Sequence, residues 1–245
     1  MISMLVLMAL ASTPDAIRFQ VDGVDREALV YRQAVSSGPA PVVFAFHGHM
    51  GNSRQASRSF QIQEAWPEAV VVYAQGLPTQ TFYDPRGRGN GWSTQADESN
   101  KDIRYFDELY KAVMRSYQCD PKRVFAMGHS NGAQFMYTLW AMRGSQLAAL
   151  GSCEGAGAQT VNLDPKPFFM TIGDEDALVP PRLQRKSFDK VMSVNGASGA
   201  GSPFGEKGTL YPGIKPVVLW SYHGGHQFPA DSVPTMVRFF QEVSR

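Results

Sequence analysis

Cysteine is scarce in this chain: only Cys119 and Cys153 occur among its 245 residues. Two cysteines allow at most one disulfide. Cys119 stands just before one predicted strand, at its starting edge, and Cys153 stands at the finishing end of the next. Neighbouring parallel strands would hold these positions more than about 10 Å apart, too far for a disulfide. We therefore expect two separate thiols.

An excess of charge of either sign is also lacking, since the formal net charge is +1. The sequence contains no block of basic residues, so we expect neither nucleic acid nor another polyanion as a partner. The apolar fraction of 43% and the charged fraction of 18% exclude the disordered and fibrous classes. The length fits one larger α/β domain. The oligomeric state cannot be inferred from these features.

Long hydrophobic runs are absent as well, and the most apolar segment, residues 2–11, is too short to span a membrane. Ala9 and Ala11 give the small-x-small pattern of a signal-peptidase site, and a polar stretch starts at Ser12. No Lys or Arg precedes them, which is atypical. We expect a signal peptide at residues 1–11, a mature domain at 12–245, and a secreted or periplasmic protein. The alternative is an apolar N-terminal strand or helix packed on the domain.

Strand and helix patterns alternate along the rest of the chain. Apolar runs predict buried strands at 42–46, 69–74, 124–127, 147–152, 168–172 and 217–222, after one or two early strands within 21–34. Residues with helical spacing predict helices at 102–117, 131–142, 182–194 and 232–243. This alternation indicates an α/β fold: a mostly parallel twisted sheet with helices on both faces.

Two segments, 76–99 and 196–213, are rich in glycine and other turn residues and match neither pattern. Loops of this length are often functional. Neither segment is long enough to form a large cap domain. Segment 76–99 contains Phe82, Tyr83 and Trp92, which offer aromatic surface to a phenolic group or a sugar ring. We list these three as candidate substrate-binding residues, with packing of the loop against the domain as the alternative.

A G-x-S-x-G pattern places Ser130 directly after the strand at 123–127 and at the start of a helix. This is the setting of a nucleophile elbow, in which glycines permit close approach of the backbone. The start of the helix offers N–H groups, including that of Asn131, to a developing oxyanion. The alternative is a capping serine in a glycine-rich turn.

A nucleophilic serine needs a histidine base, which follows it in the chain of this kind of fold. His223 and His226 both follow the last strand. His226 stands in a flexible Gly-Gly-His loop, so we favour it as the base and interpret His223 as structural. The side chain of His129, beside the serine, is expected to point away from it.

The acid that orients the base should follow the strand at 168–172, where Asp174, Glu175 and Asp176 stand together. Position alone leaves these three open. The second oxyanion donor should come from the loop after the strand at 42–46, and the amide of His49 is the best candidate. His47 is interpreted as a structural hydrogen-bonding residue.

Several segments together resemble the secreted polyhydroxybutyrate depolymerase and feruloyl esterase family, which belongs with carbohydrate esterase family one. The matching segments are 46–48 (FHG), 73–76 (YAQG), 120–125 (DPKRVF), 128–132 (GHSNG), 176–180 (DALVP) and 224–226 (GGH). The resemblance implies the α/β-hydrolase fold. It also points to Asp176 as the acid, because the family's acid precedes a short apolar stretch ending in Val-Pro. The chain departs from the family at His49-Met50 and at Ala133.

The leading hypothesis is a serine carboxylic-ester hydrolase that needs no metal or cofactor and works through an acyl-enzyme. The resemblance implies feruloyl or acetyl esters of polysaccharides, or polyhydroxyalkanoate-type esters, as small or polymeric substrates. An acyltransferase on the same scaffold is one alternative, since only the group that deacylates Ser130 differs. A binding protein on an inactive scaffold is another, but it would be expected to have lost a member of the triad.

Overall fold

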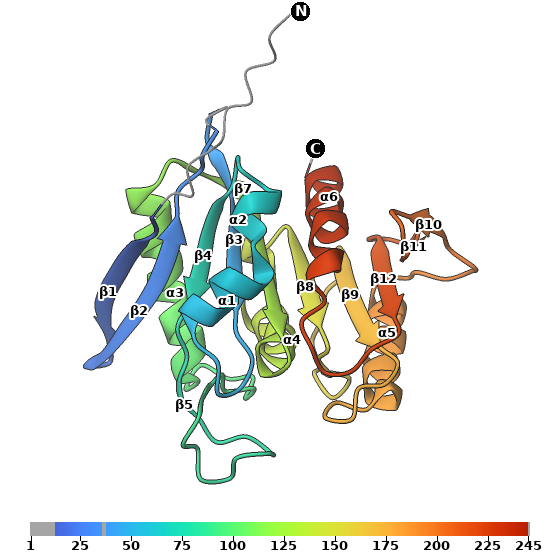
Figure 1. Ribbon diagram of the computed structural model, residues 1–245, viewed down its shortest axis with the longest axis horizontal. Helices are drawn as coiled ribbons and strands as arrows, with labels where there is room; N and C mark the ends of the chain where they lie inside the picture. Colours follow the sequence, from blue (N-terminus) through green and yellow to red (C-terminus); the bar gives the residue numbers. More distant parts are fainter. Residues whose placement is uncertain (1–12, 36–37, 245) are drawn as a thin grey trace, which may run out of the picture.

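Ten strands form one sheet in the computed structural model, which describes residues 13–35 and 38–244 (Figure 1). The signal peptide expected at residues 1–11 lies outside the described residues. The strand order is β1-β2-β4-β3-β7-β8-β9-β12-β11-β10. The bounds are β1 Asp15–Val21, β2 Val24–Tyr31, β3 Ala40–Phe46, β4 Val70–Ala74, β7 Cys119–His129, β8 Ala149–Cys153, β9 Phe168–Gly173, β10 Ser202–Phe204, β11 Gly208–Tyr211 and β12 Val217–Tyr222.

The central strands, from β4 across to β12, pair in parallel, and antiparallel pairs flank them on both sides. The prediction of a mostly parallel sheet is therefore confirmed. Side chains alternate between its faces: Val42, Phe44 and Phe46 of β3 enter one apolar cluster, and Val43 and Ala45 enter the other. A strand buried on both faces needs such a continuous apolar run.

Helices cover both faces of the sheet (Figure 1). Buried residues of three helices share one apolar cluster: α3 (Lys101–Ser116), α4 (Asn131–Arg143) and α5 (Pro181–Val194). Those of α1 (Ser53–Phe60), α2 (Ile62–Ala65) and α6 (Val233–Val243) share the other. The side chain of Asn100 accepts a hydrogen bond from the first turn of α3, as its capping position predicts. Pro181 opens α5, where a missing N–H costs nothing.

Segment 196–213, which matched neither the strand nor the helix pattern in the sequence, is partly regular. It contains the β10–β11 hairpin, which pairs with β12 and so extends the sheet at one edge. Segment 76–99 remains largely irregular, apart from the short pair β5 (Leu77–Pro78) and β6 (Asn90–Gly91). Two short 3-10 helices, Gly144–Gln146 and Ala230–Ser232, complete the elements of residues 13–35 and 38–244.

Both cysteines are free, as expected: Cys119 begins β7 and Cys153 ends the neighbouring β8.

Among the described residues, no helix has the length and apolar character needed to cross a membrane.

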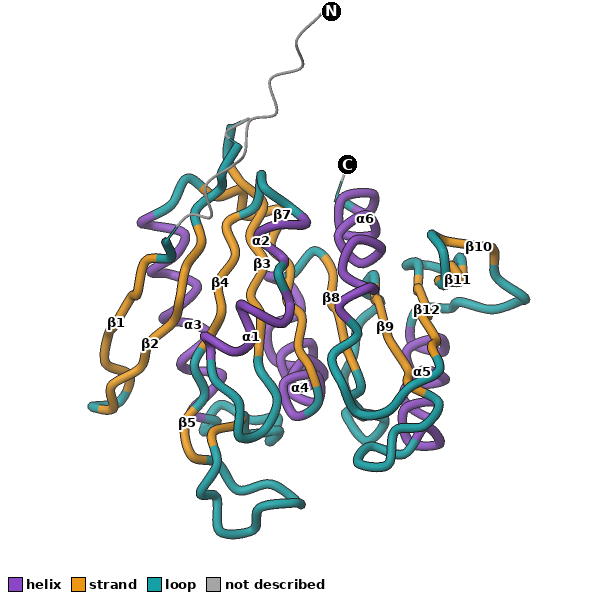
Figure 2. Tube along the Cα trace, in the orientation of Figure 1, coloured by secondary structure: helices purple, strands orange, loops and turns teal. Residues whose placement is uncertain are grey.

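The carboxyl ends of the parallel strands all point the same way, toward the loops that gather in the lower part of Figure 2. His47 follows β3, Ser130 follows β7, Glu154 follows β8, Asp176 follows β9, and His226 follows β12. Ligands of open α/β sheets bind just beyond the carboxyl ends of the strands. The fold therefore brings together polar residues that are up to 179 positions apart in the sequence.

Candidate active site

Ser130 lies on a strained turn between β7 and α4, with φ of 55° and ψ of −118°. The turn requires glycine on both sides. A Cβ on Gly128 would lie 2.3 Å from the carbonyl oxygen of Gly132, and one on Gly132 would lie 2.2 Å from that of Phe46. The amide of Ser130 donates to the Cys153 carbonyl at 2.9 Å, which fixes the turn to β8. This geometry is that of a nucleophile elbow.

Three side chains form a continuous hydrogen-bonded chain at this turn. Nε2 of His226 lies 2.7 Å from Oγ of Ser130, and its Nδ1 lies 2.8 Å from Oδ2 of Asp176. The carboxylate accepts from Nδ1–H, so Nε2 is left to accept the serine proton. The structure thus brings together the three residues expected to form a triad.

The loop after β9 explains why Asp176, rather than a neighbour, reaches His226. Oδ1 of Asp176 accepts from the amides of Leu178 and Val179, and Oδ2 accepts from the Gln184 side chain. These bonds hold a buried carboxylate in one orientation. Asp174 is half exposed and faces His223 at 3.2 Å. The Asp174–His223 pair lies outside the hydrogen-bonded chain.

His47 is a buried structural residue of the loop after β3. Its Nε2 accepts from the amide of Gly76 at 2.9 Å, so its Nδ1 carries the proton and donates to the Gly48 carbonyl at 2.7 Å. Burial lowers the pKa of His47 to about 4, although the bond to Gly48 opposes this shift. The ring is therefore neutral at pH 7.

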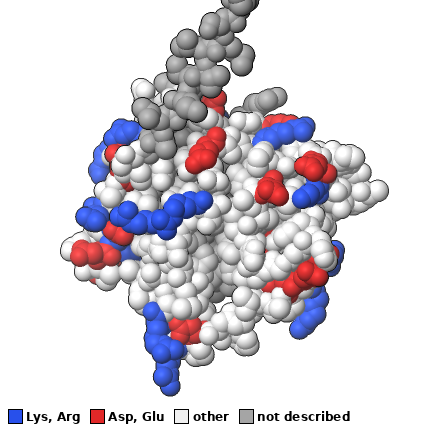
Figure 3. Space-filling model, in the orientation of Figure 1, with Lys and Arg blue, Asp and Glu red and all other residues white. Residues whose placement is uncertain are grey.

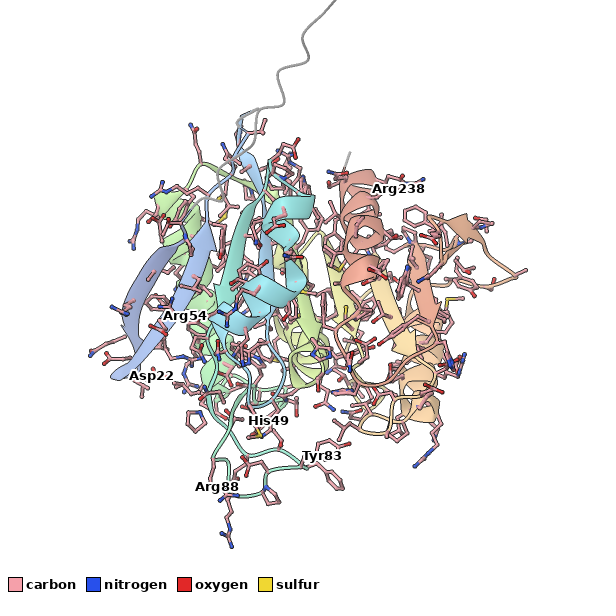
Figure 4. The ribbon with its side chains drawn as sticks, viewed as in Figure 1. Asp22, His49, Arg54, Tyr83, Arg88 and Arg238 are labelled. Carbon is pink, nitrogen blue, oxygen red and sulfur yellow. The ribbon has the colours of Figure 1, made fainter. Side chains whose placement is uncertain are left out.

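The two amides expected to form an oxyanion hole belong to His49 and Asn131. Among the described residues, neither amide donates to a backbone or side-chain acceptor, whereas the amides of Met50 and Gly51 donate to Asn90 and Gly48. The imidazole of His49 faces segment 76–99, with Nε2 3.4 Å from Oδ2 of Asp84. Figure 4 shows His49 at the edge of the sheet, above the loop that carries Tyr83 and Arg88.

Trp92 does not line the pocket, which corrects its assignment as a substrate-binding residue. Its side chain is 1% exposed and packs against Phe46 and Phe135 at ring-centroid distances of 5.0 and 5.6 Å. Its indole N–H donates to the carbonyl of His47 at 2.8 Å. Trp92 is therefore a packing residue, the alternative considered for this loop.

The other two aromatic residues of segment 76–99 have different positions. Phe82 is 90% exposed and does not line the pocket, and its ring contacts that of Tyr83 edge-on. Tyr83 does line the pocket, and its hydroxyl donates to the carbonyl of Leu178, two residues after Asp176. Of the three aromatic candidates, only Tyr83 is in a position to touch a ligand next to Ser130.

The pocket around Ser130 has a volume of about 930 Å³, a size typical of small-molecule sites. Helix α1 supplies one wall with Gln55, Ala56 and Phe60. Phe60 lies 4.1 Å from Phe228, ring to ring, on the loop after His226. Sequence reasoning missed this wall. The only local signal was Asn52, whose side chain accepts from the amide of Gln55 and caps α1.

His129 also lines the pocket, and its Nε2 lies on the side of Glu154, 3.8 Å from Oε2. Its ring lies 5.2 Å from that of His226. The pKa of His129 is lowered to about 3, chiefly by burial and also by the charge of His226. A neutral ring therefore lies beside the hydrogen-bonded chain. The described residues contain no cluster of three or more His, Cys, Asp or Glu that could hold a metal ion.

Sheet order, elbow and triad geometry define the α/β-hydrolase fold, and solved structures confirm it. An S-formylglutathione hydrolase from Agrobacterium tumefaciens superposes with a TM-score of 0.68 at 12% identity, covering 94% of this chain and 95% of that one. A carboxylesterase of Bacillus cereus gives a TM-score of 0.64 at 16% identity, covering 89% and 94%. An acetyl xylan esterase from Aspergillus awamori gives 0.62 at 14% identity, covering 88% and 94%. Identities this low establish the fold alone.

One curated relative is the bifunctional acetylxylan esterase/xylanase XynS20E of Neocallimastix patriciarum. It is 27% identical over 159 residues, which cover 63% of this chain and 22% of that protein. The chain thus matches about a fifth of the relative's length. No protein-family model matches the chain.

Proposed function

We propose that the protein is a serine carboxylic-ester hydrolase that works through an acyl-enzyme. The observation that carries the proposal is the unbroken chain from Ser130 through His226 to Asp176, at 2.7 and 2.8 Å, on a nucleophile elbow that opens into a pocket. Nucleophile, base and orienting acid in this relation are what acyl transfer requires.

In this mechanism, Oγ of Ser130 attacks the carbonyl carbon of the ester while Nε2 of His226 takes the hydroxyl proton. The amides of His49 and Asn131 donate to the oxyanion that forms. The imidazolium gives its proton to the leaving alcohol, and an acyl-serine remains. Water then attacks the acyl-serine with His226 again as base, the bond between the acyl carbon and Oγ breaks, and the imidazolium returns its proton to Oγ as the carboxylic acid leaves. Asp176 holds the imidazole in the required tautomer and stabilises its charged form throughout.

For the substrate, we propose an acetyl or feruloyl ester of a polysaccharide, with a polyhydroxyalkanoate-type ester as the competing class. The wall made by Phe60 and Phe228 suits an apolar acyl group. Asn52, Gln55 and Arg88 also line the pocket and offer polar groups to the hydroxyls of a sugar. The relative named as an acetylxylan esterase supports the first class.

The face of the molecule in Figure 3 carries interspersed acidic and basic side chains, rather than a single patch of one sign. Such a surface suits a neutral substrate. It gives no electrostatic preference for a polyanion.

A fluorophosphonate probe tests the chemistry directly. The wild-type chain should be labelled on the peptide that contains Ser130, and the Ser130→Ala variant should not be labelled. The same variant should lose about 10³-fold or more in kcat for an ester substrate while keeping its melting temperature. Labelling at another residue, or more than a tenth of wild-type activity in the variant, would refute the proposal.

A panel of p-nitrophenyl esters, methyl ferulate, acetylated xylan and polyhydroxybutyrate tests the substrate class. We expect kcat/KM to be highest for the carbohydrate-linked or feruloyl esters. Polyhydroxybutyrate as the best substrate would favour the competing class without affecting the mechanism.

A further inference from the structure

Glu154 is a buried acid at the edge of the site, and the mechanism above does not use it. It directly follows β8, has a positive φ of 50°, and is fully buried. Oε1 accepts a hydrogen bond from the hydroxyl of Thr171 at 2.7 Å. Oε2 has no hydrogen-bond partner among the described residues. A buried carboxyl oxygen without a partner is costly and calls for an explanation.

The free oxygen of Glu154 faces another buried atom without a partner. Nε2 of His129 lies 3.8 Å from it and likewise has no hydrogen-bond partner among the described residues. The gap is too long for a hydrogen bond, so the two buried atoms face each other without one. Because the ring of His129 lies against that of His226, this pair adjoins the base.

Tyr222 connects the same acid to the loop of His226. Its hydroxyl lies 3.0 Å from the carbonyl oxygen of Gly225 and 2.9 Å from that of Gln227. These carbonyls flank His226 on both sides, so one hydroxyl fixes the backbone of the base. Burial raises the pKa of this hydroxyl, and the Glu154 carboxyl is near enough to raise it too.

The groups around Glu154 favour its neutral form. Its pKa is raised to about 8, chiefly by burial; the nearby charge of Asp176 adds to the rise, and the hydroxyls of Thr171 and Tyr222 oppose it. The preceding residue, Cys153, is a buried thiol whose pKa burial raises well above its usual value. His129 is neutral because its pKa is lowered to about 3. At pH 7, Glu154 is therefore a carboxylic acid with one O–H to donate.

We propose that Glu154 is a positioning residue: as a neutral acid it donates its proton to the oxygen of Tyr222, and so keeps the Tyr222 hydroxyl bonded to the loop of His226. When Glu154 ionises, it can only accept. The hydroxyl of Tyr222 then turns toward the carboxylate, and the carbonyls of Gly225 and Gln227 lose their donor. This inference rests on the proposed role of His226 as the base.

The test compares pH profiles of kcat for wild type and Glu154→Gln, because glutamine keeps the shape and a donor but cannot ionise. Wild-type kcat should fall as pH rises past about 8, and the variant should keep its activity through pH 9. The acidic limb should be the same in both. The control Glu242→Gln, on an exposed ion pair with Arg238, should retain the wild-type profile. An alkaline limb at the same pH in Glu154→Gln and wild type would overturn the inference.

Tyr222→Phe gives an independent readout that does not depend on how well the glutamine variant folds. We expect kcat to fall by about tenfold with KM within twofold, since the loop is mispositioned and the pocket is intact. Tyr211→Phe, on the edge hairpin, serves as the matched control. Unchanged kcat in Tyr222→Phe would overturn the inference. Loss of activity in Ser130→Ala together with these negative results would leave the proposed esterase function standing.

Discussion

The side chain of Asn131 is hydrogen-bonded to both backbone groups of Trp92. Its Oδ1 accepts from the amide of Trp92 at 2.7 Å, and its Nδ2 donates to the carbonyl at 3.1 Å. The indole of Trp92 in turn donates to the carbonyl of His47. Trp92 and Asn131 therefore join segment 76–99 to the elbow and to the loop after β3, in addition to the bond between the Gly76 amide and His47.

Trp92→Ala should lower stability rather than change specificity. Removing this buried ring costs about 3 to 5 kcal/mol in the free energy of unfolding, because it leaves a cavity beside Phe46 and Phe135. Methyl ferulate and p-nitrophenyl acetate should lose kcat/KM in parallel. Phe82→Ala, at an exposed position, is the control and should leave the melting temperature unchanged. A loss of kcat/KM for methyl ferulate alone would show that Trp92 contacts the substrate.

Asp176→Asn should reduce kcat far more than Asp174→Asn, by about 10²-fold or more, because only Asp176 sets the tautomer of His226. Both substitutions remove one negative charge, so the comparison separates orientation from charge. Steady-state kinetics on one small ester decides between them. Equal losses would mean that the acid is misassigned.

Folding stability should peak near pH 6.5. His47 and His129 have pKa values of about 4 and 3 in the folded state, so the unfolded chain binds more protons below pH 6.5 and stability falls as pH drops. Glu154 has a folded pKa of about 8 against 4.5 when exposed, so its contribution falls as pH rises between those values. Between its folded and unfolded pKa values, each group changes the free energy of unfolding by about 1.4 kcal/mol per pH unit. As pH drops below 6.5, the two histidines together therefore lower stability by more than the one acid raises it.

Urea denaturation midpoints measured from pH 5 to 9 check this optimum. Glu154→Gln should remove the decline on the alkaline side and leave the acidic side in place. A wild-type midpoint that rises steadily from pH 6.5 to 8 would contradict the expected burial cost of the acid.

Phe60→Ala should enlarge the acyl side of the pocket, since Phe60 and Phe228 face each other there at 4.1 Å. We expect the ratio of kcat/KM for p-nitrophenyl butyrate over acetate to rise about threefold or more. This factor corresponds to the transfer free energy of roughly one buried methylene. Phe188→Ala, whose ring packs on Tyr211 away from the site, should leave the ratio constant. A constant ratio in Phe60→Ala would place the acyl group elsewhere.

The sheet was predictable because its central strands are buried on both faces and must be apolar throughout. The run at 42–46 has this character throughout, and the runs at 168–172 and 217–222 are apolar except for Thr171 and Ser221; each is a strand within two residues of its predicted bounds. Helix α1 was not predictable in this way. Its sequence SRQASRSF has only Ala56 and Phe60 as buried apolar residues, too few to give a helical stripe.

The site was predictable only where the local sequence carries a signal for it. The elbow around Ser130 has a local signature, because the close backbone contacts there demand glycine. Burial has no such signature, so the sequence did not distinguish the buried Trp92 from the exposed Phe82 in the same loop. The choice among Asp174, Glu175 and Asp176 came from the family resemblance, since the bonds that orient Asp176 depend on the folded loop.

The bonds that join Asn131 to Trp92 and Trp92 to His47 close separations of 39 and 45 positions along the chain. Contacts between distant segments form late, because the loops between them must first be ordered. A reactive serine should therefore be among the last features to appear during refolding. In a stopped-flow experiment, labelling of Ser130 by a fluorophosphonate should lag behind the recovery of helical circular dichroism. The chain would then reach native-like secondary structure before Ser130 reacts with the probe.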